Sequence, residues 1–61
     1  NMFLAADIYE HLGERERALE WIARVLEHGY ARADIERAPG LQQLRQDERY
    51  QRLLQRAGAE P

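Results

Sequence analysis

Residues 4–29 read LAADIYEHLGERERALEWIARVLEHG, and apolar side chains recur in this stretch at every third or fourth position. That spacing is typical of amphipathic α-helices. Gly13 interrupts the pattern, so we expect one helix from Met2 to the residues before Gly13 and a second over residues 14–28. Because only the Gly13-Glu14 corner separates them, the two helices are predicted to fold back as an antiparallel hairpin.

Both of these helices are apolar around a wide arc. At about 100° per residue, the apolar side chains span roughly 200° of each helix, whereas a surface helix ordinarily needs about 100°. In the first helix they are Met2, Leu4, Ala5, Ala6, Ile8, Tyr9 and Leu12, and in the second Ala18, Leu19, Trp21, Ile22, Ala23, Val25 and Leu26. One neighbouring helix covers only part of such an arc, so each helix is predicted to need a second neighbour.

The C-terminal part carries two apolar sets that do not share a helix face. Leu41 and Leu44 form one set, which predicts a short turn over residues 41–46. Tyr50, Leu53, Leu54 and Ala57 form the other, at the spacing of a separate helix over residues 48–57. Asp47 suits the N-cap of this helix and Gly58 its left-handed end, which leaves residues 59–61 as a tail.

This last helix has an apolar arc of only about 100°, so we expect it to have one neighbour. We predict that it caps the second helix by burying Tyr50, Leu53 and Leu54, while its three arginines, Arg49, Arg52 and Arg56, stay in solvent. Residues 1–30 are thus predicted to form the hairpin and residues 41–58 the capping helices. Residues 31–40 between them are expected to be an irregular link, in which Asp34 caps a brief turn and Pro39 keeps Ala38 out of the helical region.

Composition supports a small all-α fold and excludes several classes of function. The 61 residues contain four isoleucines or valines, none in an alternating pattern, so no strand is predicted. The chain has no Cys, Ser, Thr or Lys, which removes thiol and hydroxyl nucleophiles, Schiff bases and phosphate-loop lysines. A net charge of −2 gives no footprint for nucleic acid or an anionic membrane, and no apolar run is long enough to span one.

The remaining candidates for chemistry are few. Asp7 and His11 lie one helical turn apart and could supply two metal ligands, but no third ligand is evident, and His28 has Arg24 beside it. Glu16 and Glu20 are spaced as an acid–base pair would be, yet both lie on the polar face. We therefore expect no catalytic residue, no metal site and no cofactor. The arginine stripe of the last helix is interpreted as a solvated outer face, with a phosphate or an acidic partner as the alternative.

Two wide-arc helices followed by a narrow-arc helix are the pattern expected at the end of a solenoid of helical repeats. The hairpin also resembles a tetratricopeptide repeat. Six residues match positions of that family. Ala6 matches the small residue, Tyr9 the tyrosine, Gly13 the interhelix glycine, Ala18 the second-helix alanine, Ile22 the next large apolar residue and Leu26 the closing leucine. Four residues depart from the family pattern. Met2 replaces its first aromatic residue, Ala5 its leucine, Val25 its second alanine and Tyr30 its terminal proline. The resemblance implies that Ala6 and Ala18 let the two helix axes approach closely.

Residues 39–54, PGLQQLRQDERYQRLL, are similar to a segment that closes many bacterial tetratricopeptide arrays. That segment typically reads Asp-Pro, Leu-x-x-Leu-Arg, Asp-Pro-Arg-Phe, Leu-Leu. Here Ala38 replaces the first aspartate, Glu48 the second proline and Tyr50 the phenylalanine. The resemblance implies an interaction module of a larger bacterial regulatory or signalling protein in the cytoplasm, with a protein or peptide as its partner.

These observations leave three hypotheses about function. The first is the C-terminal repeat and cap of a tetratricopeptide array, without catalysis, for which the start at Asn1-Met2 indicates an internal cut or a cloning scar. The second is a complete small helical protein that forms a homodimer through its hairpin, and the third is an enzyme. Under the first two, we expect the first helix to contact the preceding repeat or a second copy through Met2, Phe3, Leu4, Ile8 and Tyr9. Helix packing is assigned to Ala6, Ala18, Ile22 and Leu26, and Trp21 to the core.

Overall fold

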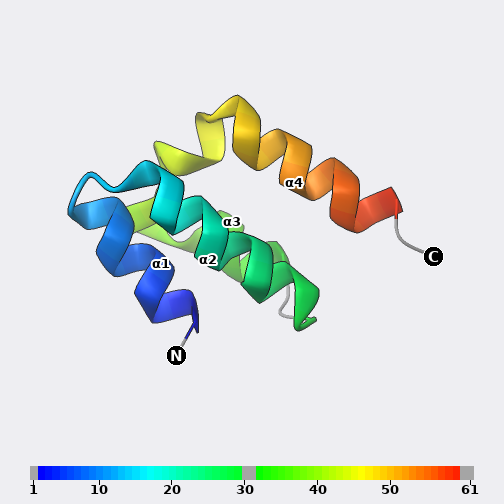
Figure 1. The fold of residues 1–61 in the computed structure, drawn as a ribbon, viewed down its shortest axis with the longest axis horizontal. Coiled ribbons are helices and arrows are strands. Elements are labelled where there is room, and N and C mark those ends of the chain that lie inside the picture. Colours follow the sequence, from blue (N-terminus) through cyan, green and yellow to red (C-terminus); the bar gives the residue numbers. More distant parts are fainter. Residues whose placement is uncertain (1, 30–31, 60–61) are drawn as a thin grey trace.

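The computed structural model describes residues 2–29 and 32–59, and every regular element in them is helical (Figure 1). In chain order these elements are α1 (Met2–His11), α2 (Arg15–Glu27), α3 (Arg32–Arg37), the 3₁₀ turns η1 (Pro39–Leu41) and η2 (Leu44–Gln46), and α4 (Glu48–Ala59). The expected all-α class is therefore confirmed. Asn1, Tyr30, Ala31, Glu60 and Pro61, on which parts of the predicted hairpin, link and tail fall, lie outside the described residues.

The first two helices form the predicted antiparallel hairpin, and Gly13 makes the turn. Gly13 has a φ of 80°, which is the left-handed region that glycine enters without a steric cost. The amide of Glu14 donates to the Tyr9 carbonyl at 2.9 Å, and the amide of Gly13 donates to the Glu10 carbonyl at 3.1 Å. This pair of bonds is the Schellman arrangement, which satisfies the last carbonyls of α1 while the chain reverses.

The core lies between the hairpin and the C-terminal segments. Ala6 and Ala18, the two small residues expected where the helices come closest, are both fully buried. The remaining members of the core come from every later segment: Leu19, Ile22, Val25, Ile35, Leu41, Leu44 and Tyr50. Since Ile35, Leu41 and Leu44 have no exposed surface, α3 and the two turns complete a core that the hairpin alone leaves open.

The expectation of an irregular link over residues 31–40 is wrong for most of its length, because residues 32–37 form α3. This helix buries Ile35 and carries two ion pairs at helical spacing, Arg32 with Glu36 and Arg37 with Asp34. Asp34 thus lies inside the helix rather than capping a turn. The helix ends before Ala38, which is extended at ψ 115° as Pro39 requires.

The predicted cap of α4 is confirmed, but its predicted end is wrong. The amide of Arg49 donates to Asp47 Oδ1 at 2.9 Å, so Asp47 is the N-cap. The helix continues to Ala59 and does not stop at Gly58, and the described glycines with left-handed backbones are Gly13 and Gly29. A glycine within a helix costs only about 1 kcal/mol relative to alanine, which does not by itself end the helix.

In Figure 1, α4 runs beside α2 and in the same direction, on the side of α2 away from α1. Tyr50 is 2% exposed at the start of α4, whereas Leu53 and Leu54 are only half-buried. Arg49, Arg52 and Arg56 are exposed. The last helix therefore covers one side of α2 most completely at its N-terminal end.

Candidate functional site

The outer side of α1, together with the residue that follows it, carries a row of exposed apolar side chains, which we call the α1 ridge: Leu4, Ile8 and Leu12. Their exposed fractions are 54%, 50% and 66%. Residues four positions apart lie on one face of a helix, so the three side chains form a continuous stripe. They are the exposed large hydrophobic residues of the described chain. A contiguous apolar surface of this kind is a candidate contact surface.

The ridge coincides only in part with the association face expected from the sequence. Leu4 and Ile8 belong to both, but Met2, Phe3 and Tyr9 are half-buried and pack against the core. Phe3 was expected to face a partner because its neighbours on the helix are polar. Instead α1 contacts η1 on that side, and Phe3 lines the space between them. Leu12 was missed as a contact residue, although its spacing from Leu4 and Ile8 was visible in the sequence.

Arginines lie against two aromatic side chains of the hairpin, Tyr9 and Trp21. The Arg17 guanidinium lies 5.9 Å from the centre of the Tyr9 ring, and that of Arg24 lies 4.7 Å from the centre of the Trp21 ring. Trp21 is half-buried and packs against the core, as expected. These cation–π contacts reduce the apolar surface that the rings present to solvent. The exposed apolar surface of the hairpin is thereby confined largely to the ridge.

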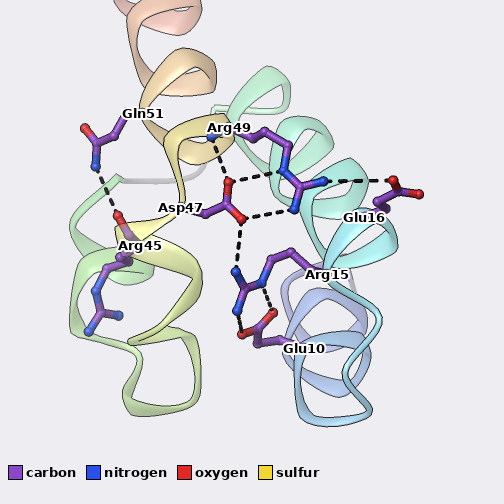
Figure 2. Close-up of polar contacts among 7 residues, drawn as sticks. All are labelled: Glu10, Arg15, Glu16, Arg45, Asp47, Arg49 and Gln51. Atoms are coloured by element: carbon purple, nitrogen blue, oxygen red, sulfur yellow. Dashed lines mark hydrogen bonds and ion pairs between the residues drawn. The ribbon is translucent and has the colours of Figure 1, made fainter.

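A chain of ion pairs fixes the helices that carry this surface, and Figure 2 shows its members. Arg15 binds both carboxylate oxygens of Glu10 at 2.7 Å and Asp47 Oδ2 at 3.0 Å. The Glu10 side chain is 8% exposed and that of Asp47 15% exposed, so both are shielded from solvent. One guanidinium therefore joins the end of α1, the start of α2 and the cap of α4.

The same cluster extends to the surface through Arg49. Its Nη2 lies 3.0 Å from Asp47 Oδ2, and its Nη1 lies 4.0 Å from the exposed Glu16 (Figure 2). Hydrogen bonds from the Arg49 side chain, and then from the Arg49 amide, hold the pKa of Asp47 well below its usual range. The hydrogen bond with Glu10 is the main cause that raises the pKa of Arg15. A carboxylate so stabilised is a weak base, which suits a structural clamp better than acid–base chemistry.

A second set of hydrogen bonds holds the C-terminal end of α3. Arg45, in η2, donates from Nη1 to the carbonyls of Ile35 at 3.0 Å and Ala38 at 2.6 Å. A cation at the C-terminal end of a helix satisfies free carbonyls and matches the helix dipole. Gln51 of α4 in turn donates to the Arg45 carbonyl at 3.0 Å (Figure 2). These bonds join α3, η2 and α4.

An open groove of about 680 Å³ lies between the C-terminal halves of α2 and α4. Its apolar lining consists of Ala23, Leu26, Leu53 and Ala57. Glu27 borders it on α2 and Arg56 borders it on α4. The groove explains why Leu26, assigned to helix packing, and Leu53, assigned to the cap, are only half-buried. Ala6, Ala18 and Ile22, the other residues assigned to helix packing, are fully buried.

The residues considered for chemistry are dispersed on the surface. His11, His28, Glu16 and Glu20 are all exposed. Within residues 2–29 and 32–59, no three His, Cys, Asp or Glu side chains gather as a metal site would require. None of the helices in the described part of the chain is long and apolar enough to cross a membrane.

Comparison with known proteins gave no match, whether to family models, to curated proteins or to solved structures. The resemblance to tetratricopeptide repeats therefore depends on the residues of the hairpin and tail alone.

Proposed function

We propose that this chain is a non-catalytic protein-interaction module, the terminal hairpin and capping helices of a tetratricopeptide-like solenoid. The observation that carries the proposal is the α1 ridge at one edge of the hairpin. At the other edge α4 lies against α2 (Figure 1). The arginines of α4 are exposed. An end unit of a solenoid needs this asymmetry, because one side stacks on the preceding repeat and the other meets water.

The size of the ridge favours a covalently linked neighbour over a free partner. Burying a leucine or isoleucine side chain fully is worth about 1.5–3 kcal/mol, so covering three half-exposed ones yields about 2–5 kcal/mol. A binding free energy of about 4 kcal/mol corresponds to a dissociation constant of about 1 mM. A preceding repeat on the same chain has an effective concentration in the millimolar range, so even this small surface is covered.

The alternative is a complete small protein that forms a homodimer through the same surface. One feature of the ridge favours it: Leu4 and Leu12 lie symmetrically on either side of Ile8. In a two-fold antiparallel pair of α1 helices, Ile8 would meet Ile8 of the second copy and Leu4 would meet Leu12. The small free energy of covering the ridge predicts that such a dimer is weak.

The proposed setting follows the family resemblance. The module would belong to a bacterial regulatory or signalling protein in the cytoplasm and would bind a protein or peptide, with no role for nucleic acid, a membrane or a cofactor. Nucleic acid is left out of this setting because a net charge of −2 over 61 residues offers no general attraction for polyanions.

Sedimentation equilibrium tests the proposal. At chain concentrations up to about 1 mM we expect reversible self-association. Leu12→Glu should weaken it about tenfold, because a charge would be buried on the ridge. Gln55→Glu makes the same change of charge at an exposed position of α4 and should leave association unchanged. A parent chain that stays monomeric throughout this range would overturn the proposal.

A fusion protein distinguishes the solenoid module from the homodimer. With a consensus tetratricopeptide repeat joined to the N-terminal side of Asn1, the solenoid proposal predicts that the ridge is covered and the chain is monomeric. Self-association that persists unchanged in the fusion would favour the homodimer.

A further inference from the structure

A second cavity lies on a different face of α1 from the ridge. It is a cleft of about 490 Å³ between α1, α3 and η1. Its walls include Phe3 and Asp7 from α1, Asp34 and Arg37 from α3, and Pro39 and Gly40 from η1. Apolar walls with a few polar groups are typical of ligand sites.

The Asp7 side chain lies against the backbone of η1. It is half-buried, and its carboxylate lies directly against Gly40. A Cβ atom at Gly40 would overlap Asp7 Oδ1, so a larger residue at that position would require the carboxylate to move. Oδ2 lies farther from the same point, at 3.6 Å. The absence of a side chain at Gly40 therefore leaves room for the carboxylate at the wall of the cleft.

The charge of Asp7 is not neutralised by the rest of the described chain. No ion pair or side-chain hydrogen bond joins it to another residue within 2–29 or 32–59. The other acid of the cleft, Asp34, binds Arg37 Nη2 at 2.8 Å. Two carboxylates and one guanidinium leave the lining with a net charge of −1.

We propose that this cleft binds a basic side chain, arginine or lysine, presented by a polypeptide partner. The charged end would pair with Asp7, and the aliphatic stem that carries it would pack against Phe3 and Pro39. The ring of Phe3 would also attract the positive charge. An anionic ligand would meet two carboxylates, and a wholly apolar one would cover Asp7 without a partner. Arg37 does not occupy the place of the ligand, because it is bound to Asp34 and its side chain is 76% exposed.

The proposal rests on the proposed interaction function in one respect, that the cation arrives on a polypeptide. Recognition of the cation itself is independent of the ridge, of the solenoid and of self-association. The two proposals can therefore fail separately, since one is measured by ligand binding and the other by sedimentation.

The test is a titration of the ¹⁵N-labelled chain with acetyl-Gly-Arg-Gly-amide, followed by NMR. Saturable shifts are expected at the amides of Phe3, Asp7 and Gly40, with a dissociation constant on the order of 1 mM. The citrulline peptide has the same shape without the charge and should bind about tenfold more weakly. Equal binding of the arginine and citrulline peptides would overturn the proposal, and this comparison needs no variant to fold.

A pair of variants makes the assignment specific. Asp7→Asn removes the charge with little change of shape and should weaken the arginine peptide about tenfold. Glu36→Gln makes the same change of charge on the exposed side of α3, outside the cleft, and should bind like the parent. A folded Asp7→Asn chain that binds the arginine peptide as tightly as Glu36→Gln would also overturn the proposal.

Discussion

Arg15, the first residue of α2, donates a hydrogen bond of 3.0 Å to Asp47, which caps α4 and lies 32 positions later in the chain. Because Arg15 also binds both oxygens of Glu10 at the end of α1, one guanidinium joins three helices (Figure 2). Arg49 also binds Asp47, with Nε donating to Oδ1 at 3.1 Å and Nη2 donating to Oδ2 at 3.0 Å. The start of α4 is thereby fixed against the hairpin, while the groove opens farther along the two helices.

The Asp47 carboxylate predicts a loss of stability in acid. Its pKa in the folded chain is lowered, chiefly by Arg49, so folding favours the ionised form. That stabilisation is complete above the ordinary aspartate pKa of about 3.9 and is lost as the pH falls toward the lower folded value. We expect the melting temperature to fall from about pH 5 downward, and to fall less steeply in Asp47→Asn. Parallel slopes for parent and variant would contradict this account.

Ala18 predicts the cost of separating the hairpin helices. It has no exposed surface, so a larger side chain at this position would have to displace its neighbours in the core. Ala18→Leu should therefore destabilise the fold by about 1–3 kcal/mol in urea unfolding. Ala33→Leu makes the same substitution at an exposed position of α3 and should change stability by less than about 0.5 kcal/mol. Equal stabilities for the two variants would show that the alanine contact is not tight.

Two leucines on either side of the Asp47 cap predict which part of the C-terminal segment contributes most to the free energy of unfolding. Leu44 is fully buried, so Leu44→Ala should cost about 2–5 kcal/mol. Leu53 borders the open groove and is half-buried, so Leu53→Ala should cost only about 1–2 kcal/mol. Chemical unfolding of the two variants ranks them directly. A larger loss for Leu53 would mean that the groove is closed in solution.

The elements predicted correctly from the sequence are those with a local signal. The apolar period and Gly13 specify the hairpin, and Asp47 specifies the start of α4, because each signal acts within a few residues of its effect. The burial of the small residues Ala6 and Ala18 in the core is likewise predicted correctly.

Apart from the end of α4, which a local signal places at Gly58, the errors concern segments whose structure depends on contacts that only the folded chain brings together. The six residues of α3 include a single buried apolar side chain, Ile35, which is too little to show a helical period. The polar neighbours of Phe3 on the helix suggest that it faces a partner, but η1 covers that side. The bond between Arg15 and Asp47 spans 32 positions and leaves no pattern in the sequence.

Gly13 predicts opposite effects for the two mirror forms of alanine. Its φ of 80° disfavours an L side chain, so Gly13→Ala should cost about 1–2 kcal/mol. The same positive φ is favourable for a D residue, so a D-alanine introduced by chemical synthesis should avoid the backbone strain of the L form. It should stabilise the chain by up to about 1 kcal/mol, because it restricts the unfolded state. Equal melting temperatures for the two forms would contradict a left-handed residue at this turn.

Tyr50 predicts a stabilising substitution in the core. The residue is 2% exposed, and its hydroxyl is buried without a hydrogen-bond partner in the described structure. Burial also raises the pKa of this hydroxyl. A buried polar group without a partner costs about 1–3 kcal/mol, so Tyr50→Phe should keep the packing of the ring and raise the melting temperature. Tyr9→Phe, at a half-buried position on α1, is the matched control and should have little effect. A fall in stability for Tyr50→Phe alone would mean that the hydroxyl has a hydrogen-bond partner in solution, such as a buried water molecule.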